Sequence, residues 1–168
     1  MADAWWEDYH FILLDTGGLE AHPEGVIRQL VQEQAEMAVA DADVIILMTD
    51  VVDGMTPSDI EAAELLRSTK KPVVLAVNKV DNDTREFGAP EFYALGMGDP
   101  EPISAFHNYG IYSLMARVIS HMEPDPYGPE EEMEELDDSA PTYDQGALNL
   151  AIVGRTNVGK SSLLNAIL

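Results

Sequence analysis

The chain has 168 residues, 46% of them apolar, no cysteine and a formal net charge of −22. This length and apolar content predict a globular domain with a buried core, and the absence of cysteine excludes a disulfide framework or a thiolate metal site. The acidic balance argues against nonspecific binding to a nucleic-acid backbone. No apolar run is long enough to span a bilayer and the first ten residues do not resemble a secretory signal, so we expect a cytoplasmic protein without membrane contact.

Strand-like and helix-like segments alternate along the chain. In chain order we expect strand 11–14, helix 23–41, strand 43–48, helix 56–68, strand 73–77, a short helix near 90–95, a short strand at 102–104, helix 111–122, strand 148–153 and a helix that begins at Lys160. The sequence Thr56-Pro57-Ser58-Asp59 is typical of a helix start, with Thr56 as the cap. Residues 123–146 carry ten acidic residues, four prolines and no basic residue, so we interpret them as a solvated linker.

Alternating strands and helices are typical of a mostly parallel sheet covered by helices on both faces. Ligands of such α/β sheets bind at the carboxyl ends of the strands. The candidate motifs of this chain all follow predicted strands, which is where that rule places a binding site.

The most specific motif is Gly154-Arg-Thr-Asn-Val-Gly-Lys-Ser161, which matches the phosphate-loop pattern G-x-x-x-x-G-K-[ST] at every fixed position. Its glycines let backbone N–H groups surround a phosphate, Lys160 can reach the terminal phosphates, and the Ser161 hydroxyl can bind Mg²⁺. An ordinary glycine-containing turn is the alternative, which the flanking strand and helix disfavour. The predicted phosphate-binding residues are Gly154, Asn157, Val158, Gly159, Lys160, Ser161 and Ser162.

Two weaker motifs follow earlier strands. Asp15-Thr16-Gly17-Gly18 has the form D-x-x-G, in which the aspartate holds Mg²⁺ through water and a glycine N–H contacts a γ-phosphate. Asn78-Lys79-Val80-Asp81 places a carboxylate that can accept from the N1 and N2 donors of guanine, which adenine cannot match. Ser104 and Ala105 are expected to support the same base through backbone N–H groups. Each of these motifs alone is also compatible with a polar turn.

Taken in order, these motifs resemble those of the translation-factor-like GTPases. The match narrows to one family, because four segments closely resemble the bacterial tandem-G-domain GTPase family Der, also called EngA. These segments are 12–20 (ILLDTGGLE), 26–82, 92–111 and 152–168 (IVGRTNVGKSSLLNAIL). The resemblance covers nearly the whole chain except the linker and the first residues. In that family, an acidic linker joins two G domains, a small KH-like domain follows them, and the protein is implicated in assembly of the large ribosomal subunit.

The resemblance implies a P-loop NTPase-like fold that is incomplete or circularly permuted. It implies that residues 1–122 are part of the first G domain, that 123–146 are the linker, and that 147–168 begin the second G domain. Thr156 stands where the family usually has proline, and Asn157 matches an asparagine that helps hold K⁺ in related GTPases. Leu19 stands where Ras-like proteins carry a water-orienting glutamine, and no catalytic residue is assigned.

By the family's fold, the phosphate-loop strand lies between strands 11–14 and 43–48. Without it, those strands would face each other across about twice the usual 4.8 Å spacing and leave costly unpaired backbone groups. Strand 148–153 is a near copy of the missing strand, and the linker is long enough to cross a small domain. We therefore hypothesise that 148–168 fills the gap, either as a circularly permuted domain or as a domain swap between two chains.

The resemblance also implies a GTP-binding GTPase that converts GTP to GDP and phosphate with Mg²⁺, and with K⁺ as a further candidate ion at Asn157. Its implied partners are guanine nucleotide and the large ribosomal subunit, with no direct nucleic-acid binding expected from this chain. The alternatives are a guanine-nucleotide-dependent binding scaffold and a fragment without a competent site. Because switch I and its Mg²⁺-completing threonine are missing, we expect weakened nucleotide binding and slow or absent hydrolysis.

Overall fold

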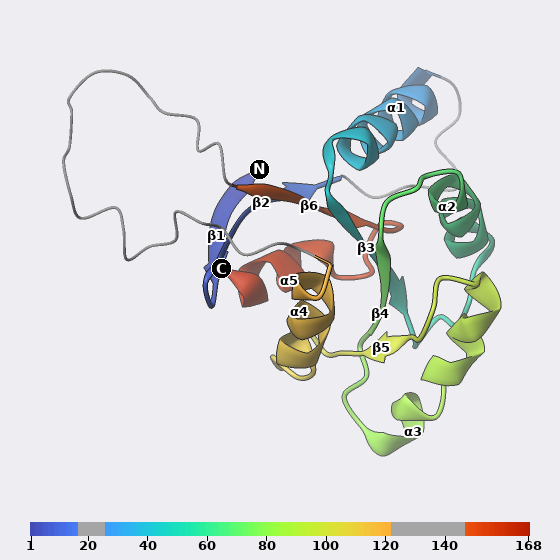
Figure 1. Cartoon of the computed structure of the whole chain (residues 1–168). Helices are drawn as coiled ribbons and strands as arrows, with labels where there is room; N and C mark the ends of the chain where they lie inside the picture. The colour runs from blue at the N-terminus through green and yellow to red at the C-terminus, as the bar shows by residue number, and fades with distance from the viewer. Residues whose placement is uncertain (17–25, 122–146) are drawn as a thin grey trace, which may run out of the picture.

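A computed structural model of the chain describes residues 1–16, 26–121 and 147–168 (Figure 1). Its centre is a six-stranded sheet with the strand order β1-β2-β6-β3-β4-β5. The strands are β1 (Ala2–Trp6), β2 (Tyr9–Asp15), β3 (Val44–Asp50), β4 (Val73–Asn78), β5 (Glu101–Pro102) and β6 (Leu148–Val153). Only the β1–β2 pair is antiparallel, and the other pairs are parallel. The predicted α/β class with a mostly parallel sheet is therefore confirmed.

The strand from the end of the chain lies in the middle of the sheet. β6, red in Figure 1, pairs in parallel with β2, where Leu13 is opposite Leu150, and with β3, where Ile45 is opposite Ala151. Its last four residues, Leu150 to Val153, are fully buried. This is the position that the gap-filling hypothesis requires, and here the pairing is made within one chain. Both neighbouring strands thereby gain partners for backbone groups that would otherwise be buried unpaired.

Helices cover both faces of the sheet, as predicted. They are α1 (Val26–Asp41), α2 (Pro57–Arg67), α3 (Asp83–Glu86), the 3₁₀ helix η1 (Ala89–Leu95), α4 (Ile111–Ile119) and α5 (Lys160–Ile167). One core cluster joins α4 and α5 to side chains such as Phe11, Ile46 and Ile152. The other joins α1, α2 and η1 to the opposite face through side chains such as Ile45 and Val153. The alternation of side chains along each strand thus supplies two apolar faces.

Local signals explain several element boundaries. Thr56 caps α2, since its side chain accepts from the Asp59 N–H while the Asp59 carboxylate accepts from the Thr56 N–H at 2.8 Å. This reciprocal capping box satisfies two otherwise unpaired donors, and the predicted Thr56 cap is confirmed. Gly110 precedes α4 with φ of +71°, and a Cβ there would lie 2.5 Å from the Pro102 carbonyl oxygen, so glycine is required for a close backbone approach.

Three expectations need correction. β1 was not predicted; it is an edge strand joined to β2 by a tight turn in which Glu7 has φ of +53°. The expected strand at 102–104 is instead Glu101–Pro102, because Ser104 has already left the strand to form an isolated antiparallel bridge with Tyr109. The expected helix 111–122 ends at Ile119. The acidic linker lies outside the described residues.

In the part of the chain that the structure describes, no helix is both long and apolar enough to cross a membrane.

Candidate functional site

A pocket of about 670 Å³ lies at the carboxyl edge of the sheet, between the loops that follow β4, β5 and β6. Its lining comes from segments that are far apart in sequence: Asn78, Lys79, Asp81, Arg85, Ser104, Phe106, His107, Thr156, Asn157, Gly159, Lys160, Ser161 and Ser162. The structure therefore brings the predicted phosphate loop and the predicted base-recognition residues to one cavity. A pocket of this size can hold a ligand as large as a nucleotide.

The loop between β6 and α5 curls tightly because two glycines permit it. A Cβ on Gly154 would lie 2.4 Å from the Met48 carbonyl oxygen. Gly159 has φ of +103°, and a Cβ there would lie 2.4 Å from Asn78 Nδ2. Lys160, at the start of α5, is buried and its ammonium donates to the carbonyl oxygens of Gly154 at 3.0 Å and Arg155 at 2.9 Å. The loop thus surrounds a buried cation at the positive end of a helix, which favours an anionic ligand.

Asn78 connects the three loops of the pocket. Its Nδ2 donates to the Val158 carbonyl oxygen at 2.7 Å, and its Oδ1 accepts from the Ala105 N–H at 2.9 Å. The side chain is 3% exposed, so both bonds are shielded from water. Asn78 therefore holds the phosphate loop and the Ser104–Ala105 segment in a fixed relation to the end of β4, and it acts through these loops as well as lining the pocket.

The Asp81 carboxylate is held beside the pocket by two neighbours. Its Oδ2 accepts from Arg85 Nη1 at 2.6 Å, and its Oδ1 accepts from Asn82 Nδ2 at 2.9 Å. Arg85 Nη1 also lies 3.2 Å from the Lys79 carbonyl oxygen, so one guanidinium spans the loop after β4. These bonds orient an ionised carboxylate, which can accept hydrogen bonds from a ligand's N–H groups. Arg85 was not foreseen, because it lies beyond the four-residue motif.

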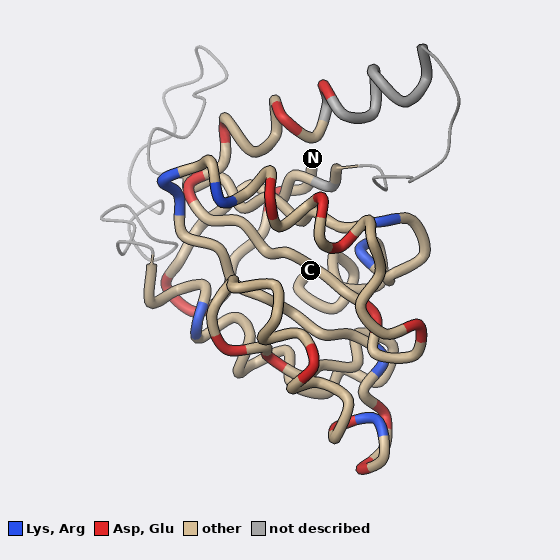
Figure 2. The backbone as a smooth tube through the Cα atoms, turned by 90° about the vertical axis from the view of Figure 1, so that its right-hand side faces the viewer, with Lys and Arg blue, Asp and Glu red and all other residues tan. Residues whose placement is uncertain are grey.

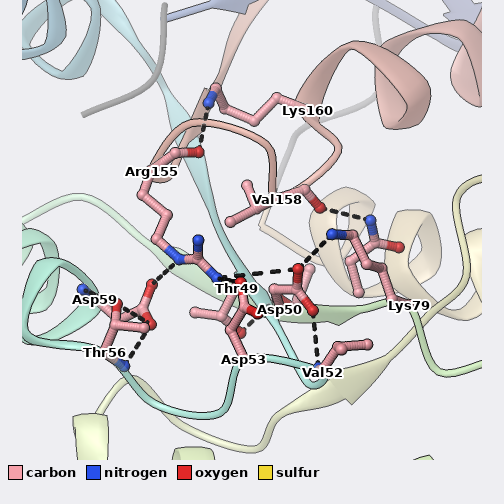
Figure 3. Close-up of polar contacts among 12 residues, drawn as sticks. Thr49, Asp50, Val52, Asp53, Thr56, Asp59, Lys79, Arg155, Val158 and Lys160 are labelled. Atoms are coloured by element: carbon pink, nitrogen blue, oxygen red, sulfur yellow. Dashed lines mark hydrogen bonds and ion pairs between the residues drawn. The ribbon is translucent and has the colours of Figure 1, made fainter. Parts of the chain in front are cut away.

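A buried charge network extends behind the pocket (Figure 3). Asp50, at the end of β3, is fully buried; its carboxylate pairs with the Lys79 ammonium and accepts from the Val52 N–H at 2.8 Å. Arg155 of the phosphate loop lies 3.9 Å from the same carboxylate. A single acidic group thus faces cations from both ligand-binding loops, which offsets the cost of burying its charge.

Arg155 ties the same loop to α2 and to the segment before it. Its Nη2 donates to Asp53 Oδ2 at 2.6 Å, and its Nε lies 3.9 Å from Asp59 Oδ1 (Figure 3). The hydrogen bond from Arg155, followed by its positive charge, lowers the pKa of Asp53 below its ordinary value of 3.8. No role was predicted for Asp50 or Arg155. An aspartate after a buried strand is a signal that could have identified Asp50, since Asp15 was singled out on that basis.

The first two residues of the D-x-x-G motif, Asp15 and Thr16, lie at the end of β2. Thr16 is buried and its hydroxyl donates to the Ile152 carbonyl oxygen at 2.8 Å, so it anchors this end of β2 to β6. The side chain of Asp15 and residues 17–25, which include Gly17, Gly18 and Leu19, lie outside what the structure describes.

The remaining predicted residues fall into two groups. Those that line the pocket are Asn78, Lys79, Asp81, Ser104, Asn157, Gly159, Lys160, Ser161 and Ser162. Ala105, Gly154 and Val158 support the pocket through the backbone atoms that bind Asn78 or Lys160. The pocket also contains Phe106 and His107, two side chains that no sequence motif indicated.

The donor atoms at the phosphate loop suit a hard cation that keeps most of its water. Among residues 1–16, 26–121 and 147–168, no three His, Cys, Asp or Glu side chains form a group that could hold a metal ion. Ser161 contributes a hydroxyl oxygen to the pocket. Mg²⁺ typically binds through one or two protein oxygens together with waters and substrate phosphates, so this sparse set of donors fits Mg²⁺ when a phosphorylated ligand is present.

A phosphate loop between a parallel strand and a helix, with an Asn-Lys-x-Asp loop on the same sheet edge, defines the class of P-loop GTP-binding proteins. The family model described as 50S ribosome-binding GTPase matches residues 2–79 and 149–168, more than half of the chain, and the chain belongs to this family. The residues between the two matched segments, 80–148, include the predicted acidic linker at 123–146.

Curated relatives agree with this membership. GTPase Der of Staphylococcus haemolyticus is 45% identical over 163 residues, which cover 97% of this chain and 34% of the relative. GTPase Der of Acetivibrio thermocellus is 46% identical over 169 residues, which cover 99% of this chain and 35% of the relative. GTPase Der of Geobacillus thermodenitrificans is 44% identical over 167 residues. The resemblance to Der is therefore confirmed, and the chain spans about a third of the length of these relatives.

Proposed function

We propose that this chain binds GTP and GDP in the pocket between the loops after β4, β5 and β6. The observation that carries the proposal is the lining of that pocket, where Lys160 and Ser161 share one cavity with Lys79 and Asp81. The lining of the cavity thus offers hydrogen-bond donors that suit a phosphate, and a carboxylate acceptor that suits the N–H groups of a base. A cavity lined by both kinds of group suits a nucleotide whose base and phosphates are recognised separately.

At the phosphate end, the chain's own residues would bind and orient the anion. Backbone N–H groups of the loop and of the start of α5 would direct their partial positive charge toward the phosphates. The Lys160 ammonium would exchange its hydrogen bonds to the Gly154 and Arg155 carbonyl oxygens for hydrogen bonds to phosphate oxygens. Ser161, with Asp15 acting through water, would hold Mg²⁺. When bound, that ion neutralises charge on the phosphate oxygens. Asn157, which has φ of +63° and lines the pocket, is the proposed K⁺ contact.

At the base end, Asp81 would select guanine. Its carboxylate accepts hydrogen bonds, and guanine offers two adjacent N–H donors at N1 and N2, whereas adenine does not. Guanine can therefore donate charge-assisted hydrogen bonds to this carboxylate, and adenine gains none from it, which disfavours adenine. The backbone N–H groups of Ala105 and Ser104, which were expected to contact the base, donate to Asn78 and to the Tyr109 carbonyl oxygen in this structure. The Ser104–Ala105 segment would therefore support the base as part of a pre-formed wall.

We further propose that the whole protein hydrolyses GTP to GDP and phosphate, and that its nucleotide state controls contacts with the assembling large ribosomal subunit in the cytoplasm. Support comes from the family's description as 50S ribosome-binding GTPases and from the relatives named GTPase Der. Residues 147–168 would then begin a second G domain that here completes the sheet of the first. A nucleotide-dependent scaffold without hydrolysis is the alternative, and single-turnover hydrolysis by the full-length protein separates the two.

Calorimetric titration of the chain with GDP, GTP and ADP, in Mg²⁺ and in either K⁺ or Na⁺, tests nucleotide binding. We expect GDP and GTP to bind and ADP to bind much more weakly. Lys160→Ala should weaken GDP binding roughly 10- to 100-fold, the range of a charge-assisted hydrogen bond. Lys70→Ala, which removes an exposed lysine outside the pocket, is the matched control and should bind as the parent chain does. Equal affinity for GDP and ADP would overturn the proposal, as would the absence of any binding.

A further inference from the structure

The turn after β5 presents an exposed aromatic side chain at the rim of the pocket. Phe106 is 84% exposed and lines the same cavity as Asp81 and Lys79. His107 packs against it edge to face, with ring centroids 5.0 Å apart and an interplanar angle of 88°. An edge-to-face contact covers at most one face of the Phe106 ring, and the residue is largely exposed, so a planar ligand group can cover the other face.

Backbone bonds fix the turn that carries this ring. The N–H of Ser104 donates to the Tyr109 carbonyl at 2.9 Å, and the N–H of Tyr109 donates to the Ser104 carbonyl at 3.0 Å. On the other side, the Ala105 N–H is bonded to the buried Asn78. The backbone of a turn closed in this way is already placed before a ligand arrives, so less backbone conformational entropy is lost on binding.

We propose that Phe106 is a stacking platform for the purine ring of the bound nucleotide. This inference rests on the proposed function, since it assigns a second contact to the same base. Asp81 would read the edge of the base, and Phe106 would cover its face. Every purine has a similar face, so stacking adds affinity without choosing between bases, whereas the carboxylate makes the choice.

Exposed apolar side chains are common on proteins, so exposure alone does not identify a platform. Phe87 illustrates this point: it is 85% exposed, yet it is not among the residues that line the pocket. The difference between the two phenylalanines is their position relative to Asp81. Phe87→Ala is therefore the matched control for Phe106→Ala, because each change removes one exposed phenylalanine side chain.

The test compares GDP with inosine diphosphate, which lacks the 2-amino group, for the parent chain and for Phe106→Ala, Phe106→Trp and Phe87→Ala. We expect Phe106→Ala to weaken both nucleotides by the same factor, roughly 5- to 150-fold, which is the range of base–aromatic stacking. Phe106→Trp should restore binding of both, and Phe87→Ala should leave both unchanged. The unfolding temperature should not move with either alanine variant, because neither removes a buried contact.

Three results would overturn the inference while leaving the proposed function intact. These are parent-like binding by Phe106→Ala, a loss confined to GDP, and a failure of Phe106→Trp to restore affinity. If the parent chain itself binds no GDP, the proposed function fails first and the inference fails with it. Measuring the four proteins with both nucleotides therefore distinguishes the absence of a stacking contact at Phe106 from the absence of nucleotide binding by the pocket.

Discussion

At the scale of single residues, the buried charges behind the pocket determine how the two binding loops are held. Asp50 faces Lys79 from one loop and Arg155 from the other, and it has no exposed surface. The Arg155 side chain, which is 18% exposed, continues the network to Asp53 and Asp59. A hydrogen bond to an ionised partner is stronger than a neutral one, so this network stiffens the site where nucleotide binding needs fixed geometry.

Arg155→Met should raise the pKa of Asp53 towards its ordinary value of 3.8, because the donor and the nearby positive charge are both removed. In the parent chain the lowered pKa contributes stability that is fully present above pH 3.8 and is lost as the pH falls through the folded-state value. The part of the stability difference between parent and variant that comes from Asp53 should therefore disappear in acid.

Carboxyl carbon chemical shifts followed by NMR across pH 2–6 would measure this pKa. Arg117→Met is the control, because that arginine pairs with Glu101 and Asp99 and not with Asp53. An Asp53 titration that is the same in the parent and in Arg155→Met would contradict the assignment of the shift to Arg155.

Asn78→Ala should destabilise the chain, because it removes partners from two backbone groups. The Val158 carbonyl and the Ala105 N–H would lose their bonds, and each buried group left unpaired costs roughly 1–3 kcal/mol. Urea unfolding would measure the loss, and Asn165→Ala, an exposed change on α5, should cost little. Equal stabilities for the two variants would show that Asn78 does not connect the loops.

At the scale of elements, the sequence predicts what depends on local pattern. The runs of Val and Ile that form β3 and β4, the Thr56 cap and the phosphate loop could all be identified, because each is encoded within a few residues. β1 was missed because Ala2–Trp6 mixes a charge with small and aromatic residues, and its strand character depends on pairing with β2. The Asp50–Arg155 pairing joins the ends of β3 and β6, which are neighbours in the sheet but far apart in sequence, so no local pattern encodes it.

The phosphate loop offers a test of its own geometry. Gly159→Ala should lower stability and nucleotide affinity, since it puts a Cβ on a residue with φ of +103° and 2.4 Å from Asn78 Nδ2. The positive φ alone costs about 1–3 kcal/mol for a residue with a side chain. Gly98→Ala is the control, because Gly98 has φ of +87° but no atom lies within 4 Å of its added Cβ. The excess loss in Gly159→Ala over Gly98→Ala in thermal unfolding then measures the clash, and no excess would mean that the loop relaxes.

At the scale of the whole molecule, the order of the strands shows why the two ends of the sequence depend on each other. β6 lies between β2 and β3, so removing residues 147–168 takes a central strand from the sheet. The acidic positions are spread over helices and loops and outnumber the basic ones (Figure 2). The electrostatic field of the whole chain therefore repels a polyphosphate. Binding of a polyphosphate would rely on local hydrogen-bond donors such as Lys160 and the N–H groups at the start of α5.

A chain ending at residue 146 should lose cooperative unfolding and dispersed NMR signals, because β2 and β3 then lack their shared partner. Adding a synthetic peptide of residues 147–168 should restore both, and a peptide with Ile152→Asp should not, since Ile152 is fully buried. A natively folded and cooperative 1–146 chain would contradict the central place of β6.

We propose that the phosphate loop and the base-recognition loop of one chain bind one nucleotide. A GDP titration followed by backbone amide NMR, at a concentration where light scattering finds a monomer, tests this proposal. We expect the amides of residues 157–162 and those of 78–81 and 104–105 to shift together, with one Kd and one nucleotide per chain. Two separate isotherms, or shifts that appear only in a dimer, would contradict it.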